Sequence, residues 1–560
     1  MEAFGTDAGL AAFIEQLRVD MPSSARVVSL RSSSIPTVPV EGFVIESSDL
    51  EGTKALSIPP DLATCPQCLA ELWDPGDRRY RYAFTNCTTC GPRFTIATGV
   101  PYDRPATTMS KFEMCSACQR EYDDIEDRRF HAQPNACPDC GPTLSLLRLD
   151  GGVAHASEPL ATAAELLTRG AVVAVKGLGG FHLACDASNA GAVRLLRERK
   201  HRDEKPFAVM VADVDAARQV AEVSAEEEAL LTAPERPIVL LRRRGQTRLA
   251  AEVSPDTPLL GLFLPYTPIH HLLLDAVGRP LVMTSANVSD EPICSENAEA
   301  GRRLAGIADA ILLHDRDIAI RCDDSVARVI AGIPTIMRRS RGFVPRPFYL
   351  ARPVSRPVLA CGAHLKNTFC IASGDTAYFG PHIGDLETLA ALEFFEEAID
   401  SMQTILSVRP EVIAHDLHPG YLSTRYAMAR DDAIKVGVQH HHAHVMSAMA
   451  EHGLRGPVLG VVYDGTGFGE DGTSWGGEFL LCFPDRFERL ATFRPVRLPG
   501  GDLAMREVWR VAYSLLHDAF DGSPPVDALG LFRGIAPESI RVVSQMIDRG
   551  LNAPRARGVG

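Results

Sequence analysis

The apolar positions of the chain predict helices in some regions and strands in others. Residues 7–19 repeat apolar side chains with helical spacing, whereas residues 26–32 and 41–47 are strand-like. One helix and two short strands bury little apolar surface, so residues 1–50 are expected to be part of a larger α/β unit. Further along, helical and strand-like segments alternate, which predicts an α/β domain over residues 155–345.

Strand–turn–strand patterns return in the last third of the chain, over residues 358–386 and 458–481. In the second of them, the glycine-rich letters DGTG predict a turn at residues 464–467. Between the two patterns, residues 442–453 have the apolar spacing of a helix. Residues three or four positions apart on such a helix share a face.

Length and charge limit the classes of function. At 560 residues the chain is too long for one core, and about three or four domains are expected. Apolar residues make up 46% and charged residues 23%, which is typical of globular proteins. A formal charge of −14 disfavours a general nucleic-acid or membrane-surface binder but permits local basic pockets. No apolar run approaches a membrane span and no secretory signal is recognised, so the cytoplasm is expected.

Eight of the 14 cysteines form four C-x-x-C pairs within a repeated pattern. The pattern has a period of 50 residues, with Asp-Arg-Arg at one offset and Cys-Gly-Pro at its end. Each copy is C-x2-C-x18-C-x2-C, which supplies the four thiolates that tetrahedral zinc prefers. The eight cysteines are Cys65, Cys68, Cys87, Cys90, Cys115, Cys118, Cys137 and Cys140.

We predict two structural zinc ions over residues 51–150, one in each copy. The spacing alone leaves open an exchange of cysteine pairs between the copies. Each copy has too little core to fold alone, so the metal supplies much of its stability. Four thiolates leave two formal negative charges on each zinc, which four arginines can partly offset: Arg78, Arg79, Arg128 and Arg129.

Residues 155–345 contain four features that suit a polyphosphate. Lysine and arginine provide charge, while hydroxyls and backbone amides provide geometry. A single basic cluster is more often a solvated surface, but four such features in one acidic chain favour a shared triphosphate site. The Walker glycine–lysine pattern is absent from the sequence, so a P-loop is not expected. The features are a glycine turn with Lys176, a basic stretch with Lys200, Arg202 and Lys205, a Thr-Ser-Ala-Asn turn with Ser285 and Asn287, and an arginine cluster ending at Arg341.

Four histidines lie within five positions at the start of the helix predicted near residue 440. His440 and His444 are four positions apart, and His441 and His444 are three apart. Helical spacing prefers the first pair as metal ligands without excluding the second. Two imidazoles with a carboxylate suit Fe(II), Zn or Mn, and spacing does not choose among them.

The segments KGLGGFHL, KHRDEKPFAVM, TSANVSDEPI and RRSRGFVP resemble a YrdC-type domain, the fold that makes carbamoyl-adenylates from ATP. Together with the eight-cysteine pattern, they resemble the HypF family of hydrogenase-maturation carbamoyltransferases. The resemblance implies a multidomain α/β and α+β chain. Its expected parts are the C-terminal half of a ferredoxin-like acylphosphatase domain at 1–50, the twin zinc module at 51–150, a YrdC-like adenylating domain at 155–345 and the N-terminal part of a TsaD-like domain of ASKHA fold at 352–560.

This resemblance implies a reaction. Carbamoyl phosphate and ATP, bound with Mg, give carbamoyl-adenylate and pyrophosphate. The carbamoyl group then passes to the C-terminal cysteine of the partner HypE and becomes the cyanide ligand of the [NiFe] centre. By resemblance, the adenylation pocket contains the residues Lys176, Lys200, Arg202, Lys205, Ser285, Asn287 and Arg341.

The TsaD-like resemblance also implies a metal site. Its motif, His-x-x-x-His with a small residue before the second histidine, maps to His440 and His444, and Asp464 matches the first aspartate ligand. His441 and His442 are then expected to support the ligands or to contact substrate. The resemblance further implies nucleotide contacts at Lys366, Gly465, Thr466 and Gly467.

The chain departs from the family pattern at both ends. The arginine-containing phosphate loop of the acylphosphatase domain is missing, and so is a further aspartate ligand beyond residue 560. We therefore expect the chain to be truncated at both ends, with adenylation retained and transfer lost. Three alternatives stay open: a threonylcarbamoyladenosine-type tRNA enzyme, a small-molecule O-carbamoyltransferase, and an inactive fragment that serves as a docking scaffold for HypE.

Overall fold

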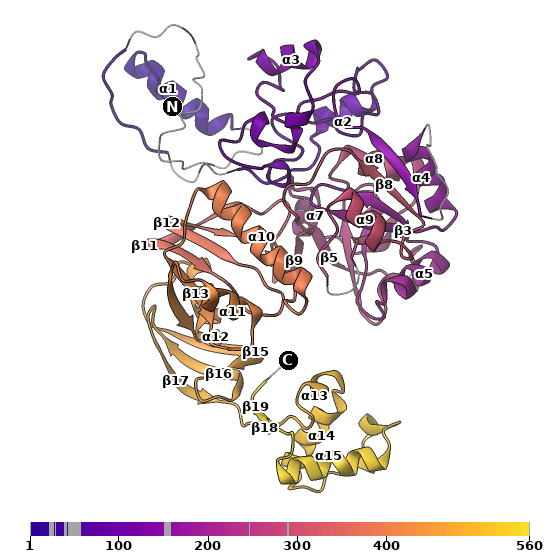
Figure 1. Ribbon diagram of the computed structural model, residues 1–560, viewed down its shortest axis with the longest axis vertical. Coiled ribbons are helices and arrows are strands. Elements are labelled where there is room, and N and C mark those ends of the chain that lie inside the picture. The colour runs from indigo at the N-terminus through magenta and orange to yellow at the C-terminus, as the bar shows by residue number, and fades with distance from the viewer. Residues whose placement is uncertain are drawn as a thin grey trace. The chain divides into compact units, whose positions relative to one another are not determined.

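The computed structural model describes residues 2–21, 27, 30–38, 42, 58–149, 158–245, 247–287 and 291–558. The chain forms two compact units (Figure 1). The first unit contains Met1–Pro347 and Tyr378–Arg409, and the second contains Phe348–Ala377 and Pro410–Gly560. Over the described stretches, none of the helices combines the length and the apolar character that a membrane crossing needs.

The helix expected near the N-terminus is confirmed as α1 (Asp7–Val19). Thr6 begins it, because its side chain accepts a hydrogen bond from the backbone N–H of Gly9. The strands expected at 26–32 and 41–47 lie largely outside the described residues. The acylphosphatase-like assignment of residues 1–50 therefore stays a prediction.

A mixed ten-stranded sheet organises the first unit, and it confirms the α/β domain. Three strand pairs, β2–β8, β4–β6 and β5–β9, are parallel, and the other pairs are antiparallel. The strands, in sheet order, are β1 (Leu144–Arg148), β8 (Ala310–His314), β2 (Val173–Lys176), β3 (Phe181–Asp186), β7 (Leu281–Ser285), β4 (Ala208–Met210), β6 (Leu259–Phe263), β5 (Ile238–Arg242), β9 (Val326–Ile330) and β10 (Ile333–Arg338).

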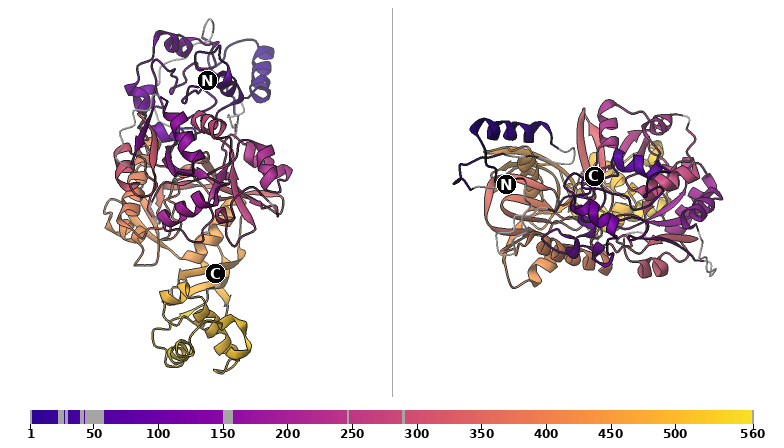
Figure 2. Two further views of the ribbon diagram at one scale, coloured as in Figure 1. Left: turned by 90° about the vertical axis from the view of Figure 1, so that its right-hand side faces the viewer. Right: turned by 90° about the horizontal axis from the view of Figure 1, so that it is seen from above.

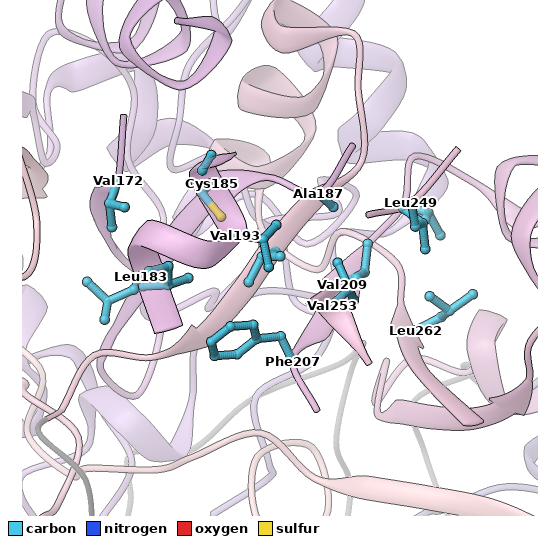
Figure 3. Packing of buried hydrophobic residues seen from close by; sticks show 14 of the residues in the cluster. Val172, Leu183, Cys185, Ala187, Val193, Phe207, Val209, Leu249, Val253 and Leu262 are labelled. Atoms are coloured by element: carbon cyan, nitrogen blue, oxygen red, sulfur yellow. The ribbon is translucent and has the colours of Figure 1, made fainter. Parts of the chain in front are cut away.

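Both faces of this sheet are buried, which explains the continuous apolar runs in its central strands. Figure 3 shows one face, where Leu183 and Cys185 of β3 pack in one cluster with Val209 of β4, Leu262 of β6 and Val193. The helices that contribute to this face are α5 (Ala190–Lys200), α6 (Val214–Val220), α7 (Ala225–Thr232) and α9 (Asn297–Arg303), and the short η4 (Ala251–Val253) adds Val253.

The opposite face packs against two helices and the cysteine-rich region. Helices α4 (Pro159–Thr168) and α8 (Pro268–Val277) share one cluster with Leu72, Tyr82 and Phe84 of the cysteine-rich region. Burying a large apolar side chain contributes about 1.5–3 kcal/mol. These side chains therefore attach the cysteine-rich region to the sheet.

The cysteine-rich region has little regular structure. Helices α2 (Pro66–Trp73) and α3 (Ser116–Asp123) each begin directly after the first cysteine of a copy. Three single-turn 3-10 helices lie between α2 and α3: η1 (Phe94–Ile96), η2 (Arg104–Ala106) and η3 (Thr108–Lys111). Strand β1 at the end of this region already pairs with β8, so the expected boundary near residue 150 falls after the first strand of the sheet.

The cysteines gather in two clusters, and each cluster contains the four cysteines of one copy. The pairing left open by the spacing is therefore within each copy. Neighbouring sulfur atoms are 3.5–3.8 Å apart. Such distances match the edge of a tetrahedron around a metal bound by sulfur at about 2.3 Å. The geometry of each cluster thus fits one zinc ion.

The arginines of each copy serve the cluster of the other copy. Arg128 of the second copy donates to the sulfur of Cys68 at 3.2 Å, and Arg78 of the first copy donates to Cys118 at 3.2 Å. A glutamate at the same offset in each copy anchors the pair of arginines from the other: Glu71 binds Arg128 and Arg129, and Glu121 binds Arg78 and Arg79. The two copies therefore depend on each other for charge balance.

The second unit contains two sheets. The first has the order β12 (Cys370–Phe379), β11 (Pro347–Ala360), β13 (Val412–Asp416) and β14 (Ile434–Val438). The second contains β15 (Val458–Phe468), β16 (Ser474–Cys482), β17 (Phe487–Thr492), β18 (Val496–Arg497) and β19 (Arg555–Ala556). Both strand pairs expected from the sequence are confirmed, as β11–β12 and β15–β16.

The helix predicted within residues 442–453 is confirmed as α12 (His440–Glu451), which packs on β15 and β16 through Val445 and Met449 (Figure 1). Helices α14 (Trp509–Ala519) and α15 (Pro537–Arg549) lie side by side in Figures 1 and 2 and share a small core. The other helical segments are α10 (Leu389–Leu406) in the first unit and, in the second, α11 (Leu422–Ala429), α13 (Asp502–Arg506), η5 (Val526–Ala528) and η6 (Gly530–Phe532).

The turn predicted at Asp464–Gly467 is wrong. These residues lie inside β15, where the register with β16 shifts between Tyr463 and Gly467. The reversal of the chain comes later, where the N–H of Gly469 bonds to the carbonyl of Thr473. Such an irregularity re-aims the side chains beside it, so the glycines mark a β-bulge instead of a turn.

The crossed arginines predict that loss of one arginine weakens the zinc site of the other copy. Arg128→Met removes the donors to Cys68, and loss of such outer hydrogen bonds costs roughly 10–100-fold in metal affinity. We expect Cys65, Cys68, Cys87 and Cys90 to become more reactive toward an alkylating agent during zinc chelation, as mapped by mass spectrometry.

Arg120→Met is the matched control, because Arg120 is an exposed arginine in the same copy. It should leave both clusters protected. Greater reactivity of Cys115, Cys118, Cys137 and Cys140 in the Arg128 variant would contradict the finding that the arginines of one copy stabilise the cluster of the other.

Candidate functional site

Two polar turns meet at the ends of neighbouring strands in the first unit. Between β2 and β3, the N–H of Gly177 bonds to the carbonyl of Gly180 and closes the glycine turn. The N–H of Phe181 bonds to the carbonyl of Cys294, just beyond the Thr-Ser-Ala-Asn turn. A Cβ on Gly179 would lie 2.2 Å from the carbonyl oxygen of Cys322, so this position requires glycine.

Lys200 joins the basic stretch to the Thr-Ser-Ala-Asn turn. It lies at the end of α5 and is 2% exposed. Its ammonium donates to the carbonyl oxygens of Ser285 and Asn287, both at 2.7 Å, and to the side-chain oxygen of Asn287. Burial, with the nearby charges of Arg202 and Lys205, lowers the pKa of Lys200 to about 7.

Arg202 follows along the same stretch and reaches the same turn. It donates to the hydroxyl of Thr284 at 3.2 Å and to the carbonyl of Lys205 at 3.1 Å. Burial, with the charges of Arg197 and Arg338, lowers the pKa of Arg202 to about 10. Lys205 itself is exposed. The structure therefore brings together Lys200, Arg202, Ser285 and Asn287 of the predicted pocket residues.

Lys176 contacts a different set of residues. Its ammonium is 1% exposed and donates to the side-chain oxygen of Asn297 at 2.7 Å and to the carbonyls of Arg316 and His314 at 3.0 and 3.2 Å. Burial and the neighbouring Arg316 lower the pKa of Lys176 to about 8. These hydrogen bonds can hold the neighbouring glycine turn in place.

Arg341 is also enclosed, at 1% exposed. It donates to the carboxylate of Asp324 at 2.7 Å, and its guanidinium lies 3.5 Å from the ring centre of Tyr266. Asp324 also bonds to His182 of β3 at 3.0 Å. Burial acts to raise the pKa of Asp324, but Arg341 and His182 lower it overall. This geometry favours a supporting role for Arg341, and its nucleotide contact stays a prediction.

Sequence reasoning missed His382, which belongs to the first unit although it follows a strand of the second. Burial and then Arg338 lower its pKa to about 4, while Asp323 and Asp385 act in the opposite direction and Lys205 adds to the lowering. Asp323 pairs with Arg338 at 2.8 Å. No local sequence pattern assigns residue 382 to this group of charges, because residues 348–377, which separate it from Arg338 and Asp323 along the chain, belong to the other unit.

In the second unit, α12 and the bulge of β15 bring three predicted metal ligands together. His440 and His444 lie one helical turn apart, with ring centres 5.0 Å apart. One ligand atom from each of His440, His444 and Asp464 lies within 4.8 Å of the others. Nε2 of His440 is 3.3 Å from a carboxylate oxygen of Asp464.

Asp416 at the end of β13 holds the ring of His440. Nδ1 of His440 is 2.7 Å from the carboxylate of Asp416, so Nε2 faces the cluster. Burial acts to lower the pKa of His440, but Asp416 and Asp464 raise it to about 9. Sequence reasoning missed Asp416, whose signal is an aspartate at the end of a buried strand. Such carboxylate–histidine pairs orient metal-binding imidazoles.

The bulge glycine Gly467 is a packing requirement. A Cβ there would lie 2.5 Å from Cε1 of His441 and 2.9 Å from Cδ2 of His440. The histidines of α12 therefore pack directly on the backbone of β15. The hydroxyl of Thr466 bonds to that of Ser474 at 2.7 Å, and Lys366 lies exposed in the loop before β12. Nucleotide contacts at Lys366 and at Gly465–Gly467 stay predictions.

The donor set fits a metal ion. Two imidazoles and a carboxylate are ligands that Fe(II), Zn and Mn accept. Oδ2 of Asp464 is buried and faces Nε2 of His440 at 3.3 Å, whereas Nε2 of His441, outside the three-residue cluster, lies 3.7 Å from the same oxygen. His442 points elsewhere, because its Nε2 lies 2.9 Å from the carbonyl of Phe483.

Four family descriptions match the chain. Residues 64–97 and 114–147 match the HypF finger, and residues 165–340 match a family described as Telomere recombination. Residues 353–451 match the HypF Kae1-like domain, and residues 460–560 match the second subdomain of the carbamoyltransferase Kae1-like domain.

Relatives extend over nearly the whole chain. It is 49% identical to carbamoyltransferase HypF2 of Cupriavidus necator, covering 100% of this chain and 72% of that protein. It superposes on full-length HypF in its phosphate- and nucleotide-bound form with a TM-score of 0.93 and 43% identity, covering 99% of this chain and 72% of that one. HypF of T. kodakarensis gives a TM-score of 0.90 and 40% identity, over 99% and 73% of the two chains. The chain therefore belongs to the HypF family of carbamoyltransferases.

Proposed function

We propose that this carbamoyltransferase activates a carbamoyl group as carbamoyl-adenylate, with carbamoyl phosphate as donor and ATP as adenylating agent. Water first cleaves carbamoyl phosphate to carbamate and inorganic phosphate. A carbamate oxygen then attacks the α-phosphorus of ATP, and pyrophosphate leaves. The thiolate of the C-terminal cysteine of HypE then attacks the carbamoyl carbon and AMP leaves, and the resulting thiocarbamate leads to the cyanide ligand of the [NiFe] hydrogenase centre.

One observation carries the adenylation step: Lys200 binds the Thr-Ser-Ala-Asn turn to the basic stretch. The turn supplies backbone amides and hydroxyls, and the stretch supplies positive charge next to them. Both are fixed before ATP arrives, which is what stabilises a charged transition state without reorganisation. We assign phosphate contacts to Arg202 and to the exposed Lys205, with Ser285 and Asn287 shaping the turn.

No covalent enzyme intermediate is required. The attacking oxygen and the leaving pyrophosphate lie in line at a pentavalent phosphorus, so positioning and electrostatics supply the catalysis. Lys176 supports the glycine turn and Arg341 supports the segment around Asp324, as their enclosed positions suggest. Mg bound to ATP shares the phosphate charge.

We assign transfer to the second unit, where His440, His444 and Asp464 hold a divalent metal. Such an ion, when bound, acts as a Lewis acid that orients substrate oxygens. Asp416 keeps Nε2 of His440 directed at the ion. The loop with Lys366 and the backbone of Gly465–Gly467 are proposed to contact the nucleotide of the adenylate.

The test of the proposed reaction is exchange of labelled pyrophosphate into ATP. The chain is incubated with ATP and either carbamoyl phosphate or carbamate from ammonium bicarbonate, with and without HypE. Exchange that depends on either carbamoyl source supports adenylation. Exchange with carbamate alone would show that adenylation does not require this chain to cleave carbamoyl phosphate. Absence of exchange in all arms contradicts the proposal, and a requirement for threonine with bicarbonate favours a threonylcarbamoyladenosine-type enzyme.

Two substitutions separate the proposed steps. Lys205→Ala should reduce exchange by roughly 10–150-fold because it removes an accessible positive charge from the phosphate site, where a charged hydrogen bond contributes about 1.5–3 kcal/mol. His440→Ala should leave exchange largely intact, because His440 belongs to the other unit. Pyrophosphate exchange measures both variants, and its loss in both would show that the steps are not separable.

The affinity for ATP should depend on pH through Lys200. As pH rises through about 7, the ammonium becomes an amine with two hydrogens for three acceptors, so the turn loosens and a positive charge is lost. We expect ATP binding, measured calorimetrically, to weaken by about tenfold above neutrality, which is ~1.4 kcal/mol.

Lys200→Arg keeps its charge at every pH in this range. Its ATP affinity should therefore vary less with pH than that of the unsubstituted chain. Parallel profiles for the two proteins would exclude Lys200 as the source of the pH dependence.

A further inference from the structure

The side chain of Gln439 has one possible orientation. Gln439 precedes α12 and is buried, and its side-chain oxygen accepts a hydrogen bond from the backbone N–H of His442 at 2.9 Å. Its side-chain nitrogen donates to the backbone carbonyl of Phe468 at 3.2 Å. A backbone N–H only donates and a carbonyl only accepts, so these two contacts fix which end of the amide is nitrogen.

This orientation determines where the proton of His441 lies. The same nitrogen of Gln439 is 3.3 Å from Nδ1 of His441. An amide nitrogen offers only hydrogens, so Nδ1 has to be the acceptor, and in a neutral imidazole the proton then lies on Nε2. His441 is 0% exposed, which disfavours the doubly protonated ring.

The packing of α12 directs that N–H at the candidate metal cluster. The ring of His441 lies against the backbone of Gly467, and its centre is 5.9 Å from the ring of Trp475. Nε2 is 3.7 Å from Oδ2 of Asp464. Among the described residues, both atoms are buried without a hydrogen-bond partner. The Nε2–H donor of His441 and the Oδ2 acceptor of Asp464 thus face each other beside the candidate metal cluster.

We propose that His441 is a positioning residue, which directs its Nε2–H toward the carboxylate of Asp464, 3.7 Å away, and is kept from binding the metal by Gln439. The proposal rests on the proposed metal centre of His440, His444 and Asp464. A nitrogen that carries a proton has no lone pair for a metal, so the third histidine leaves a coordination position open. Metal sites that act on substrates require such a position.

The first test reads the proton of His441 directly. The chain is labelled with ¹⁵N-histidine, and two-bond ¹H–¹⁵N spectra are compared with those of His441→Gln, which identifies the signals of this ring. We expect the proton on Nε2 in the unsubstituted chain. In Gln439→Glu the introduced carboxylate accepts from Nδ1–H, so the proton should move to Nδ1. A proton on Nδ1 in the unsubstituted chain overturns the proposal.

The second test measures metal binding with the cysteine clusters kept filled with zinc. Mn²⁺ is titrated, and the free ion is counted by electron paramagnetic resonance. His441→Phe keeps an aromatic ring but loses the donor, so affinity should fall roughly 10–100-fold. His441→Gln keeps a donor and should restore most of the loss, whereas equal affinities of the Phe and unsubstituted proteins contradict the proposal.

The outcomes separate this proposal from the metal centre on which it rests. His444→Ala removes a ligand but leaves Gln439 and His441 unchanged, so it should lose Mn²⁺ and keep the Nε2 proton. If the unsubstituted chain binds no Mn²⁺, the metal centre fails and the spectra still decide the state of His441. Thermal melting and zinc content of each variant distinguish a local effect from misfolding, and Gln439→Met, which removes the amide without adding charge, replaces Gln439→Glu if the latter does not fold.

Discussion

The sheet of the first unit has two faces to bury, and this constraint organises the chain around it. A central strand such as β2 is buried at every position, so neither face tolerates water. Helices cover one face, and two helices with the cysteine-rich region cover the other. The cysteine-rich region is therefore part of the core of the first unit. Because its two four-cysteine clusters fit zinc ions, we expect metal to stabilise its fold and, through that fold, the packing of its apolar side chains against the sheet.

Burial of the sheet also explains where the polar chemistry lies. Apolar side chains dominate the strand interiors, apart from residues such as His182 of β3, and most charged groups of the proposed site lie beyond the strands. Lys176 at the end of β2 and Lys200 at the end of α5 are buried, which is costly for a charged group, and the ammonium of each donates to three oxygen acceptors. Their enclosed ammonium groups fix the shape of the two turns to which a nucleotide is proposed to bind.

Adjacent histidines of α12 acquire opposite properties from their neighbours. Asp416 and Asp464 raise the pKa of His440 to about 9, whereas burial lowers that of His441 to about 4. Asp416 directs Nε2 of His440 toward the cluster, and Gln439 places a proton on Nε2 of His441. The neighbouring histidines therefore have different roles: the carboxylate of Asp416 orients the ring of His440, and the amide of Gln439 sets which nitrogen of His441 carries the proton.

Local patterns predicted much of this fold and of its sites. The cysteine spacing identified both clusters, and helical periodicity identified α1 and α12. The sequence could not reveal groups joined only by tertiary structure, such as Glu71 with Arg128, Asp416 with His440, or His382 in the first unit. It also mistook the bulge of β15 for a turn, because glycine serves both and only the register of the partner strand separates them.

We propose that the first unit makes a carbamoyl-adenylate independently of the proposed metal centre in the second. The most direct test of this proposal is mass spectrometry of His444→Ala after incubation with ATP and ¹³C-labelled carbamoyl phosphate or ¹³C-labelled carbamate. We expect a species that contains AMP and the labelled carbamoyl carbon, formed together with pyrophosphate. Formation of ADP without any labelled adenylate, in a protein whose cysteine clusters retain zinc, would contradict it.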